Sequence, residues 1–506
     1  MIAAQPETLV QLAILIPLAA AALIPLFHRA PNLRETVTLV SAAALALIVW
    51  SLYGPVMAGA RPELNGPEMV PGIRVALKVE PLGLVYALVA STLWIVNSIY
   101  SIGYMRGHDE PRQTSFYVCF AIAIASALAI AFAGNLVTLF LAYEVLTIST
   151  YPLVTHKASD EARRSGRKYL LLLIGTSMVL LLPAIIITAA VAGTADFTTG
   201  GILAGKLSPL LMTGLLALYV FGIGKAAVMP VHFWLPAAMV APTPVSALLH
   251  AVAVVKAGVF SILKVVVYIF GIDTLTNSGA VDKLIWIPAA TILIASLIAM
   301  TKDNLKARLA YSTVSQLSYI VTGALLATSL GVIGSGMHIA MHAVGKITLF
   351  FCAGAIYVAA HKTEVSELTG LGRAMPITFA AFTIGTLSII GLPPFGGTWR
   401  KWYLALGAIE ADKLAVVAIL MISSLLNIAY LLPIPFRAFF GRPPASAGAA
   451  AAHGHKHGHG HAHGDGKIHE APTACLIAIS ATALGCIALF VYPDFLLDLL
   501  KQIPLR

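Results

Sequence analysis

Two lysines, two histidines and four prolines lie between Gly222 and Lys256, in a stretch that is otherwise strongly apolar. A charge at the centre of a membrane-spanning helix costs on the order of 3 kcal/mol, so such a residue needs a polar partner or contact with water. Prolines interrupt helices, and interrupted helices at membrane depth are tolerated where the freed backbone is buried in protein or lines a cavity. The combination predicts a path for ions through a membrane.

Glu144 and Lys225 are the first candidates for proton exchange. Glu144 lies in the middle of the apolar run FLAYEVLTISTYPLV, and Lys225 lies just before Pro230 in the interrupted stretch. Burial favours the neutral form of each side chain, whereas contact between the two favours their charged forms. A glutamate–lysine pair whose contact can open and close is a proton switch, and we expect these two residues to form it.

A second group of ionisable residues follows the spacing of a helix. His338, His342 and Lys346 recur at i, i+4 and i+8, which places them on one stripe. The spacing His-x3-His also suits zinc. However, no HExxH glutamate accompanies it, and a lysine on the same stripe would repel a metal ion. The stripe is therefore interpreted as a proton relay, and no metal site is predicted.

Four further candidates flank these groups. His250 and Lys256 share one apolar run but are not stacked at 100° per residue, so they are expected to follow each other along a hydrated path. His232 follows the interruption and is either part of the path or an interfacial histidine. Lys401 follows a second interruption, between an arginine and a tryptophan. It is either a matching terminal lysine or an interfacial side chain that extends toward water.

The composition indicates that these residues belong to a polytopic membrane protein. The chain has 506 residues, of which 59% are hydrophobic and 11% are charged, and its mean hydropathy is +0.89. This balance excludes a soluble domain of such length. The net charge of +10 is carried mostly by short loops between apolar runs, where it sets topology, so no nucleic-acid partner is expected.

Neither end of the chain nor its cysteines suggest processing or redox chemistry. The N-terminal residues MIAAQPET lack a basic segment, so no cleaved signal peptide is expected. The four cysteines lie in apolar runs without CxxC or Cys/His ligand spacing and are interpreted as buried small residues. No flavin, haem or Fe–S motif is found, so no cofactor is expected.

Apolar runs of roughly 20 residues, the length that spans a membrane core, predict about 14 transmembrane helices. They lie near 8–27, 35–54, 82–104, 115–133, 135–154, 169–191, 209–229, 243–270, 284–301, 309–328, 332–359, 376–410, 414–436 and 473–495. The run 376–410 contains GLPPFGG and should be a second broken helix. The segment 230–240 is expected to form a short lateral helix after the first break.

The two broken spans, the seventh and the twelfth, lie five spans apart. An odd repeat length inverts the second copy relative to the first, which is the pattern of inverted repeats with ion sites on discontinuous helices. The fold class predicted is therefore an all-α membrane protein with two inverted five-helix repeats. The predicted divisions are N-terminal helices 1–3 (1–110), a first half-channel (111–270), a second half-channel (284–440), a linker (441–471) and a C-terminal helix 14 (472–506).

Loop charges set the expected orientation. Most lysines and arginines outside the apolar runs follow odd-numbered spans, so these spans should end in the cytoplasm and both termini should lie outside. The region 441–471 is rich in Gly, Ala and His and shows no helix or strand period, so it is interpreted as a flexible cytoplasmic linker. Its alternating histidines at 453–463 can bind transition metals weakly. A role as a metal-binding loop is the alternative.

Several motifs together resemble those of the proton-translocating antiporter-like subunits. The motifs are GKAAVMPVHFWLPAAMVAPTPVSALLH, FLAYEVLTISTYPLV, NLKARLAYSTVSQLSYI, HIAMHAVGKITLFFCAG, GLPPFGGTWRKW and SSLLNIAYLLP. The resemblance covers roughly residues 80–435. The family includes subunits of respiratory complex I (L, M and N), of membrane-bound hydrogenases and of Mrp-type Na⁺/H⁺ antiporters (A and D).

The resemblance implies roles for particular residues. Glu144 and Lys225 would be the coupled pair, Lys256 and His250 would fall on the central relay, and Lys401 would lie at the exit of the second half-channel. His338 and His342 match the relay histidines of the eleventh span. The family works in complexes, so partner subunits are implied, and the transported ions would be H⁺ with Na⁺ as a candidate counter-ion.

Three details bear on the choice of family member. The chain ends soon after its fourteenth span, without the long lateral-helix extension of the L-type subunit, and its lysine at 401 departs from the glutamate of the M-type subunit of complex I. The form HAVAVVKAGVF is most similar to the D-type subunit of Mrp antiporters. The resemblance thus implies a proton-translocating antiporter subunit in a bacterial or archaeal cell membrane. The alternatives are an antiporter-like subunit of a redox-driven complex, without a redox site of its own, and a stand-alone metal exporter.

Overall fold

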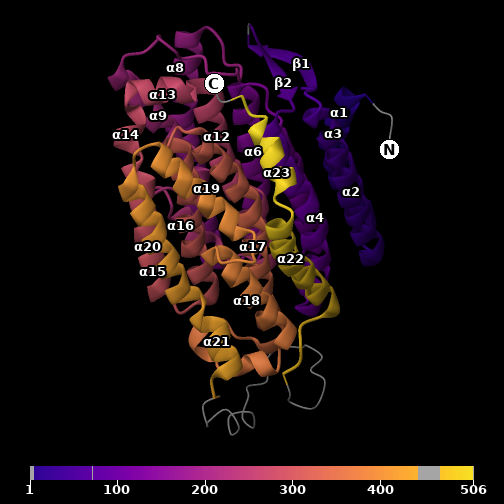
Figure 1. The fold of residues 1–506 in the computed structure, drawn as a ribbon. Coiled ribbons are helices and arrows are strands. Elements are labelled where there is room, and N and C mark those ends of the chain that lie inside the picture. The colour runs from indigo at the N-terminus through magenta and orange to yellow at the C-terminus, as the bar shows by residue number, and fades with distance from the viewer. Residues whose placement is uncertain (1–4, 71, 443–467, 505–506) are drawn as a thin grey trace.

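The structure, a computed structural model, describes residues 5–70, 72–442 and 468–504 of the chain. It is a bundle of long helices with one short β-hairpin at the end where both chain termini lie (Figure 1). Within the described residues, eleven helices are long and apolar enough to cross a membrane. The predicted class, an α-helical polytopic membrane protein, is confirmed apart from the hairpin, which the sequence analysis missed.

The N-terminal part consists of three helices and the hairpin. The elements are α1 (Pro6–Leu23), α2 (Pro31–Ser51), α3 (Tyr53–Met57), β1 (Glu63–Val70) and β2 (Ile73–Lys78). The strands are antiparallel and pair Glu63 with Lys78 and Leu64 with Leu77. The hairpin lies in the loop between the second and third predicted spans. β2 alternates apolar residues at Ile73, Val75 and Leu77, but β1 has no such period.

The next helices lead to the first break. They are α4 (Pro81–Gly107), α5 (Gln113–Ala131), α6 (Leu136–Val154), α7 (Asp160–Thr176), α8 (Leu182–Ala192) and α9 (Pro209–Gly222). A π-helical stretch joins α7 to α8, so the sixth span is one continuous helix. α9 ends at Gly222 and is followed by a single 3₁₀ turn, Gly224–Ala226. The seventh predicted span is therefore interrupted, and its helix is shorter than the predicted 209–229.

Short helices and a fully buried span follow this break. The elements are α10 (Trp234–Ala237), a 3₁₀ turn (Ala238–Val240), α11 (Thr243–Ala247) and α12 (Val254–Val265), with π-helical stretches at Leu248–Val252 and Val266–Phe270. The expected short helix at 230–240 thus has its counterpart in α10. α12 packs closely on the 3₁₀ turn, because a Cβ added at Gly258 would lie 2.3 Å from the backbone nitrogen of Ala226. This close approach requires glycine.

The second half of the chain surrounds α17, a helix of 32 residues. Its helices are α13 (Ile272–Ser278), α14 (Ala280–Leu284), α15 (Trp286–Thr301), α16 (Leu305–Leu325), α17 (Ser329–Ala360), α18 (Pro376–Ile390), α19 (Gly397–Glu410), α20 (Leu414–Leu431), α21 (Pro433–Phe440), α22 (Thr473–Val491) and α23 (Asp494–Lys501). Two 3₁₀ turns, Val365–Leu368 and Leu371–Arg373, precede α18. α17 packs against α16, α18, α19 and α22 and runs through the middle of the bundle.

The second break separates α18 from α19. Gly391 ends α18 in the left-handed conformation, with φ of +88°, which a residue without a Cβ adopts at little cost. The twelfth predicted span is therefore discontinuous, as expected. A Cβ added at Gly397 would lie 1.7 Å from the carbonyl oxygen of Ser388, so α19 begins directly against the last turn of α18.

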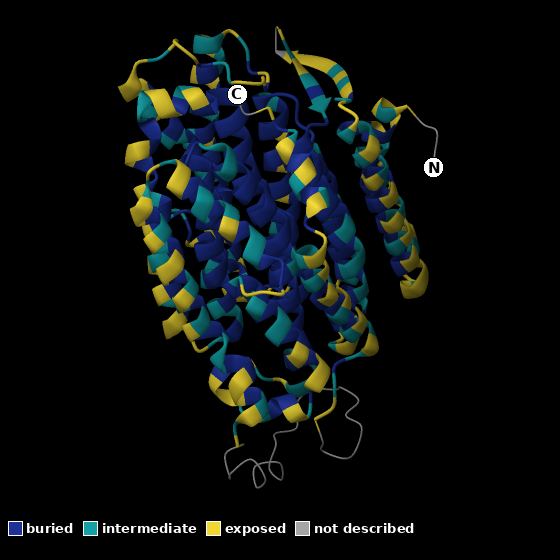
Figure 2. Ribbon diagram, in the orientation of Figure 1, coloured by how far each residue is buried: buried dark blue, intermediate teal, exposed yellow. Residues whose placement is uncertain are grey.

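Burial follows the pattern of a protein surrounded by lipid. Buried residues fill the middle of the bundle and exposed ones lie on the outer helices (Figure 2). Large apolar side chains, such as Leu171 and Leu210, are 74% and 75% exposed on this outer surface. Such a surface is stable in hydrocarbon and costly in water. Helices lie over each predicted span, while the relation of the two halves as inverted repeats stays a prediction.

Candidate functional site

The first break places Lys225 against α6. Its side chain is fully buried, and Nζ donates hydrogen bonds to the carbonyl oxygen of Tyr143 (2.8 Å) and to Oγ1 of Thr147 (2.6 Å). Glu144, the next residue on α6, is 8% exposed. Both of its carboxyl oxygens are buried without a hydrogen-bond partner in the described part of the chain. The structure thus brings Lys225 against the helix that carries Glu144, but no ion pair joins the two residues in the described part of the chain, and a backbone carbonyl and a hydroxyl hold the lysine.

In the middle of the bundle, buried side-chain nitrogens from three helices form a line. Nζ of Lys256, on α12, lies 2.6 Å from Nδ1 of His342 on α17. The ring of His342 lies 5.7 Å from that of His338, one turn earlier on the same helix. Nη1 of Arg400, on α19, lies 2.5 Å from Nε2 of His338. All four side chains have no exposed surface.

Lys346, the third member of the helix stripe, faces another direction. Its Nζ donates to Oγ of Ser312 (2.7 Å) and to the carbonyl oxygen of Leu309 (3.2 Å), both on α16. Ser312 Oγ in turn accepts a hydrogen bond from the hydroxyl of Tyr430 (2.9 Å). The predicted stripe therefore exists on one helix, but its members contact α12, α19 and α16 separately.

The two histidines of the stripe do not converge on a common point. His342 faces Lys256, and His338 faces Arg400. Because both partners carry or can carry positive charge, the geometry disfavours a bound cation between the two imidazoles. The His-x3-His spacing thus serves contacts between helices.

Lys401 ends this line beside the second break. It is 8% exposed, and its Nζ donates to the carbonyl oxygen of Ile390 (2.6 Å) and to Oγ of Ser424 (2.7 Å). Nζ also lies 5.4 Å from the ring centroid of Tyr319. The side chain therefore points into the bundle, and the alternative of an interfacial lysine that extends toward water does not describe it.

Two predicted histidines have apolar surroundings. His250 is fully buried, its ring lies 4.7 Å from that of Phe350, and neither ring nitrogen has a hydrogen-bond partner among the described residues. It lies on the π-helical stretch before α12, which packs against α17. The ring centroid of His232 lies 4.1 Å from that of Phe233 and 6.2 Å from that of Tyr311. The structure thus brings His250 near the buried line and leaves His232 beside the first break.

Sequence reasoning missed two buried cations. Arg400 was treated only as a neighbour of Lys401, although it contacts a predicted relay histidine. Lys264, on α12, forms a buried ion pair with Glu80 (3.2 Å) and donates to the carbonyl oxygen of Ala133 (2.6 Å). A lysine two helical turns after Lys256 in an apolar run was a signal that could have found this pair. Glu80 also lines a cavity of about 220 Å³ at the hairpin end of the bundle.

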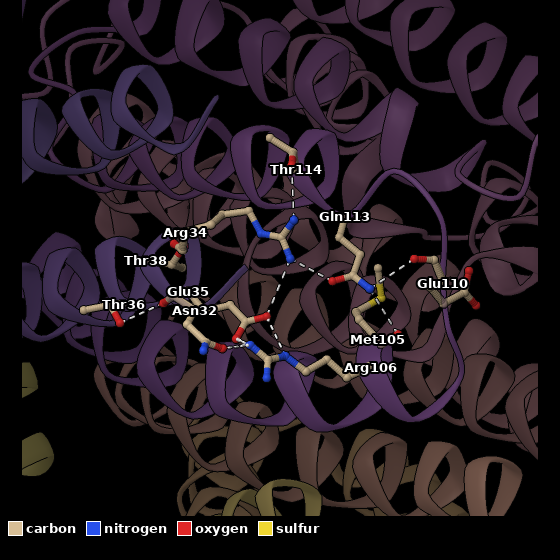
Figure 3. A network of polar contacts seen from close by, with 10 residues as sticks. All are labelled: Asn32, Arg34, Glu35, Thr36, Thr38, Met105, Arg106, Glu110, Gln113 and Thr114. Atoms are coloured by element: carbon tan, nitrogen blue, oxygen red, sulfur yellow. Dashed lines mark hydrogen bonds and ion pairs between the residues drawn. The ribbon is translucent and has the colours of Figure 1, made fainter. Parts of the chain in front are cut away.

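A network of ion pairs and hydrogen bonds at α2, α4 and the start of α5 arranges its charges differently from the buried line (Figure 3). Arg106, on α4, donates two hydrogen bonds to the carboxylate of Glu35 on α2, at 3.1 and 2.5 Å. Arg34 lies 3.6 Å from the same carboxylate and donates to Oε1 of Gln113 (2.8 Å). Here two arginines share one carboxylate and hold α2 against α4 and α5. The buried line from Lys256 to Lys401 has no such carboxylate among its hydrogen-bond partners in the residues that the structure describes.

The line contains groups that can bind and release protons. Imidazole and amine nitrogens can bind and release a proton, and the contacts from Lys256 to His342 and from Arg400 to His338 are within hydrogen-bond distance. The guanidinium of Arg400 is different because it does not release its proton. The line therefore consists of lysines and histidines, which can exchange protons, and one arginine, which carries a fixed charge.

Comparisons with known proteins show the family of this chain. Residues 133–427 match the family described as NADH:quinone oxidoreductase/Mrp antiporter, TM. The chain is 32% identical over 364 residues to NADH-quinone oxidoreductase subunit N of Desulforudis audaxviator, covering 70% of this chain and 71% of that protein. It is 31% identical over 364 residues to hydrogenase-4 component B of Escherichia coli, covering 68% of this chain and 52% of that protein.

A solved structure extends the likeness to the whole chain. A chain in the structure of the Mrp complex from Dietzia sp. DQ12-45-1b superposes with a TM-score of 0.85 at 21% sequence identity, covering 99% of this chain and 97% of that one. At this identity the likeness concerns the fold. With the family match over more than half of its length, the chain belongs to the NADH:quinone oxidoreductase/Mrp antiporter transmembrane family.

Proposed function

We propose that this chain is the proton-translocating subunit of a multisubunit monovalent cation/proton antiporter, similar to the D-type subunit of Mrp complexes. The observation that carries the proposal is the buried line of Lys256, His342, His338, Arg400 and Lys401, which crosses the bundle from the eighth span to the second break. Buried ionisable groups at membrane depth are costly, and their usual role is on an ion path.

Glu144 and Lys225 form the first half-channel in this proposal. A proton bound on Glu144 weakens the hold of the carboxylate on Lys225, and a proton released there strengthens it. The first half would pass its proton toward Lys256 and His250, and His342, His338 and Lys346 would relay it through α17. Lys401 would release it beside the second break, with the two halves acting as inverted repeats. His232 would line the path beside the first break.

The assignment to an antiporter draws support from two features of the sequence. The sequence has a lysine at 401, and its eighth span reads HAVAVVKAGVF. Partner subunits of an antiporter, with H⁺ and Na⁺ or K⁺ as transported ions, follow from this proposal.

A redox-driven complex is the second candidate. It is favoured by the matches to a quinone oxidoreductase subunit and to a hydrogenase component. In that setting the same buried line would pump protons with energy from electron transfer in other subunits. Neighbouring genes separate the two candidates quickly, because small Mrp-type subunits favour the first and oxidoreductase subunits favour the second.

The decisive experiment uses the intact complex, purified through an affinity tag on this chain and reconstituted in proteoliposomes with an internal pH dye. We expect a pulse of NaCl or KCl to move protons without any electron donor, and Glu144→Gln to abolish the response. Proton movement that needs an electron donor and acceptor would support the redox candidate instead. If neither treatment moves protons, the proposed function is wrong.

A further inference from the structure

Arg400 is a fully buried arginine whose hydrogen bonds go to uncharged groups. Among the ion pairs of the described residues, none includes Arg400. A buried arginine without a carboxylate is expensive, so its position calls for a compensating interaction.

The end of α18 supplies that interaction. Nη2 of Arg400 donates to the carbonyl oxygens of Ser388 (3.3 Å) and Ile389 (2.9 Å). The last carbonyls of a helix lack partners within the helix and carry the negative end of its dipole. Because Gly397 lets α19 start against Ser388, the guanidinium reaches these carbonyls three residues later. The arginine is thus anchored by the break itself.

The other end of the guanidinium constrains His338. Nη1 lies 2.5 Å from Nε2 of the imidazole. Arginine nitrogens only donate hydrogen bonds and do not release their protons, so Nε2 must be the acceptor. The imidazole is then neutral and carries its single hydrogen on Nδ1. A protonated imidazole has N–H groups at both nitrogens, and its Nε2–H would point at a donor.

We infer that Arg400 is a positioning residue that holds His338 in one neutral tautomer, so that His338 accepts a proton only when the Arg400–His338 contact opens. The contact lies between the Lys256–His342 pair and Lys401, where its opening would gate proton passage into the second half-channel. This inference rests on the proposed function for its role in transport, while the tautomer of His338 follows from the contact alone.

Other titratable and charged groups on neighbouring helices surround His338. Lys256 on α12 and Lys401 on α19 add positive charge near the ring, and His342 lies one turn away on α17. Tyr319 on α16 contributes a phenol ring at 5.6 Å, and α22 brings Cys486 near Arg400.

The test is a pH titration of the intact complex labelled with ¹⁵N-histidine, read by solid-state NMR. The signal of His338 is assigned as the one missing from His338→Gln. In the wild type we expect the neutral tautomer with hydrogen on Nδ1 between about pH 5 and 8, the range in which histidines ordinarily titrate. In Arg400→Gln the side-chain amide oxygen can accept from Nε2–H. We therefore expect the midpoint of protonation to move up by at least about one pH unit, a tenfold gain in proton affinity.

Either of two results would overturn the inference. One is a wild-type His338 with hydrogen on Nε2, and the other is the same titration midpoint in wild type and Arg400→Gln. The wild-type spectrum alone can decide if the variant does not assemble. Arg29→Gln, at an exposed arginine near the N-terminus, is the matched control and should leave the spectrum unchanged. Because the spectrum does not depend on transport, its outcome is separate from that of the flux assay for the proposed function.

Discussion

Both helix breaks stabilise buried positive charge, but they do so with different chemical groups. At the first break, Lys225 donates to the backbone carbonyl of Tyr143 and to a hydroxyl of α6, and Glu144 is the residue next to Tyr143 on that helix. At the second break, Arg400 and Lys401 both donate to the last carbonyls of α18, and neither is paired with a carboxylate in the described chain. One cation thus has a titratable neighbour, and the other two are held by a helix end.

This difference indicates that the two breaks have different roles. The charge of a carboxylate changes when it binds a proton, so the first break can alternate between strong and weak attraction for its lysine. The partial charge of a helix end is fixed by the backbone. The second break therefore offers constant stabilisation of positive charge, and its control must come from movement of a contact such as Arg400–His338. We expect the first break to switch and the second to gate.

Glu144→Gln is expected to have the largest effect. It preserves the shape of the side chain and removes the titration on which the first break depends. We predict a loss of proton flux of about 100-fold or more, in the range for removal of an acid–base group, with normal assembly of the complex. Flux in proteoliposomes across pH is the measurement, and Glu161→Gln, at an exposed glutamate, is the control. Transport at the wild-type level would remove Glu144 from the mechanism.

Replacement of Lys225 tests whether the first break cycles a proton or only presents a charge. Lys225→Arg keeps the positive charge but cannot release a proton at any reachable pH. We expect it to fail nearly as badly as Lys225→Ala when flux is measured in the intact complex. If arginine restores transport while alanine does not, Lys225 supplies only a fixed charge that tunes Glu144.

Lys401 tests the corresponding position at the second break. Lys401→Gln keeps a donor for the carbonyl of Ile390 but has no proton to release, and it leaves no carboxylate unpaired. We predict a smaller loss of flux than at Glu144, about tenfold, which corresponds to about 1.4 kcal/mol in the barrier. The effects should be compared in the same reconstituted preparation. A loss as large as that of Glu144→Gln would mean that the two breaks are not different in kind.

The sequence predicted the helices, both breaks and most of the ionisable residues, because each depends on local patterns. Apolar runs define spans, and the Gly-Pro clusters define breaks. The partners could not be predicted in this way. Lys256 and His342 are 86 residues apart, and only packing of α12 on α17 brings them together. Arg400 was overlooked because an arginine beside a tryptophan ordinarily lies at a membrane surface, whereas the close start of α19 at Gly397 turns it inward.

The histidine-rich region is expected to have the smallest effect, and it lies outside both breaks. Residues 453–463 fall outside the described residues, so the prediction rests on composition alone: a Gly, Ala and His segment without helix or strand period behaves as a linker. Deletion of 453–463 should change proton flux in chelator-containing medium by less than about twofold, the size of ordinary surface effects. The wild type and the deletion should also respond alike to added zinc or nickel. If the deletion lowers proton flux, and zinc or nickel changes the flux of the wild type but not that of the deletion, the segment has a regulatory role. It would then be a third element in the comparison of the two breaks.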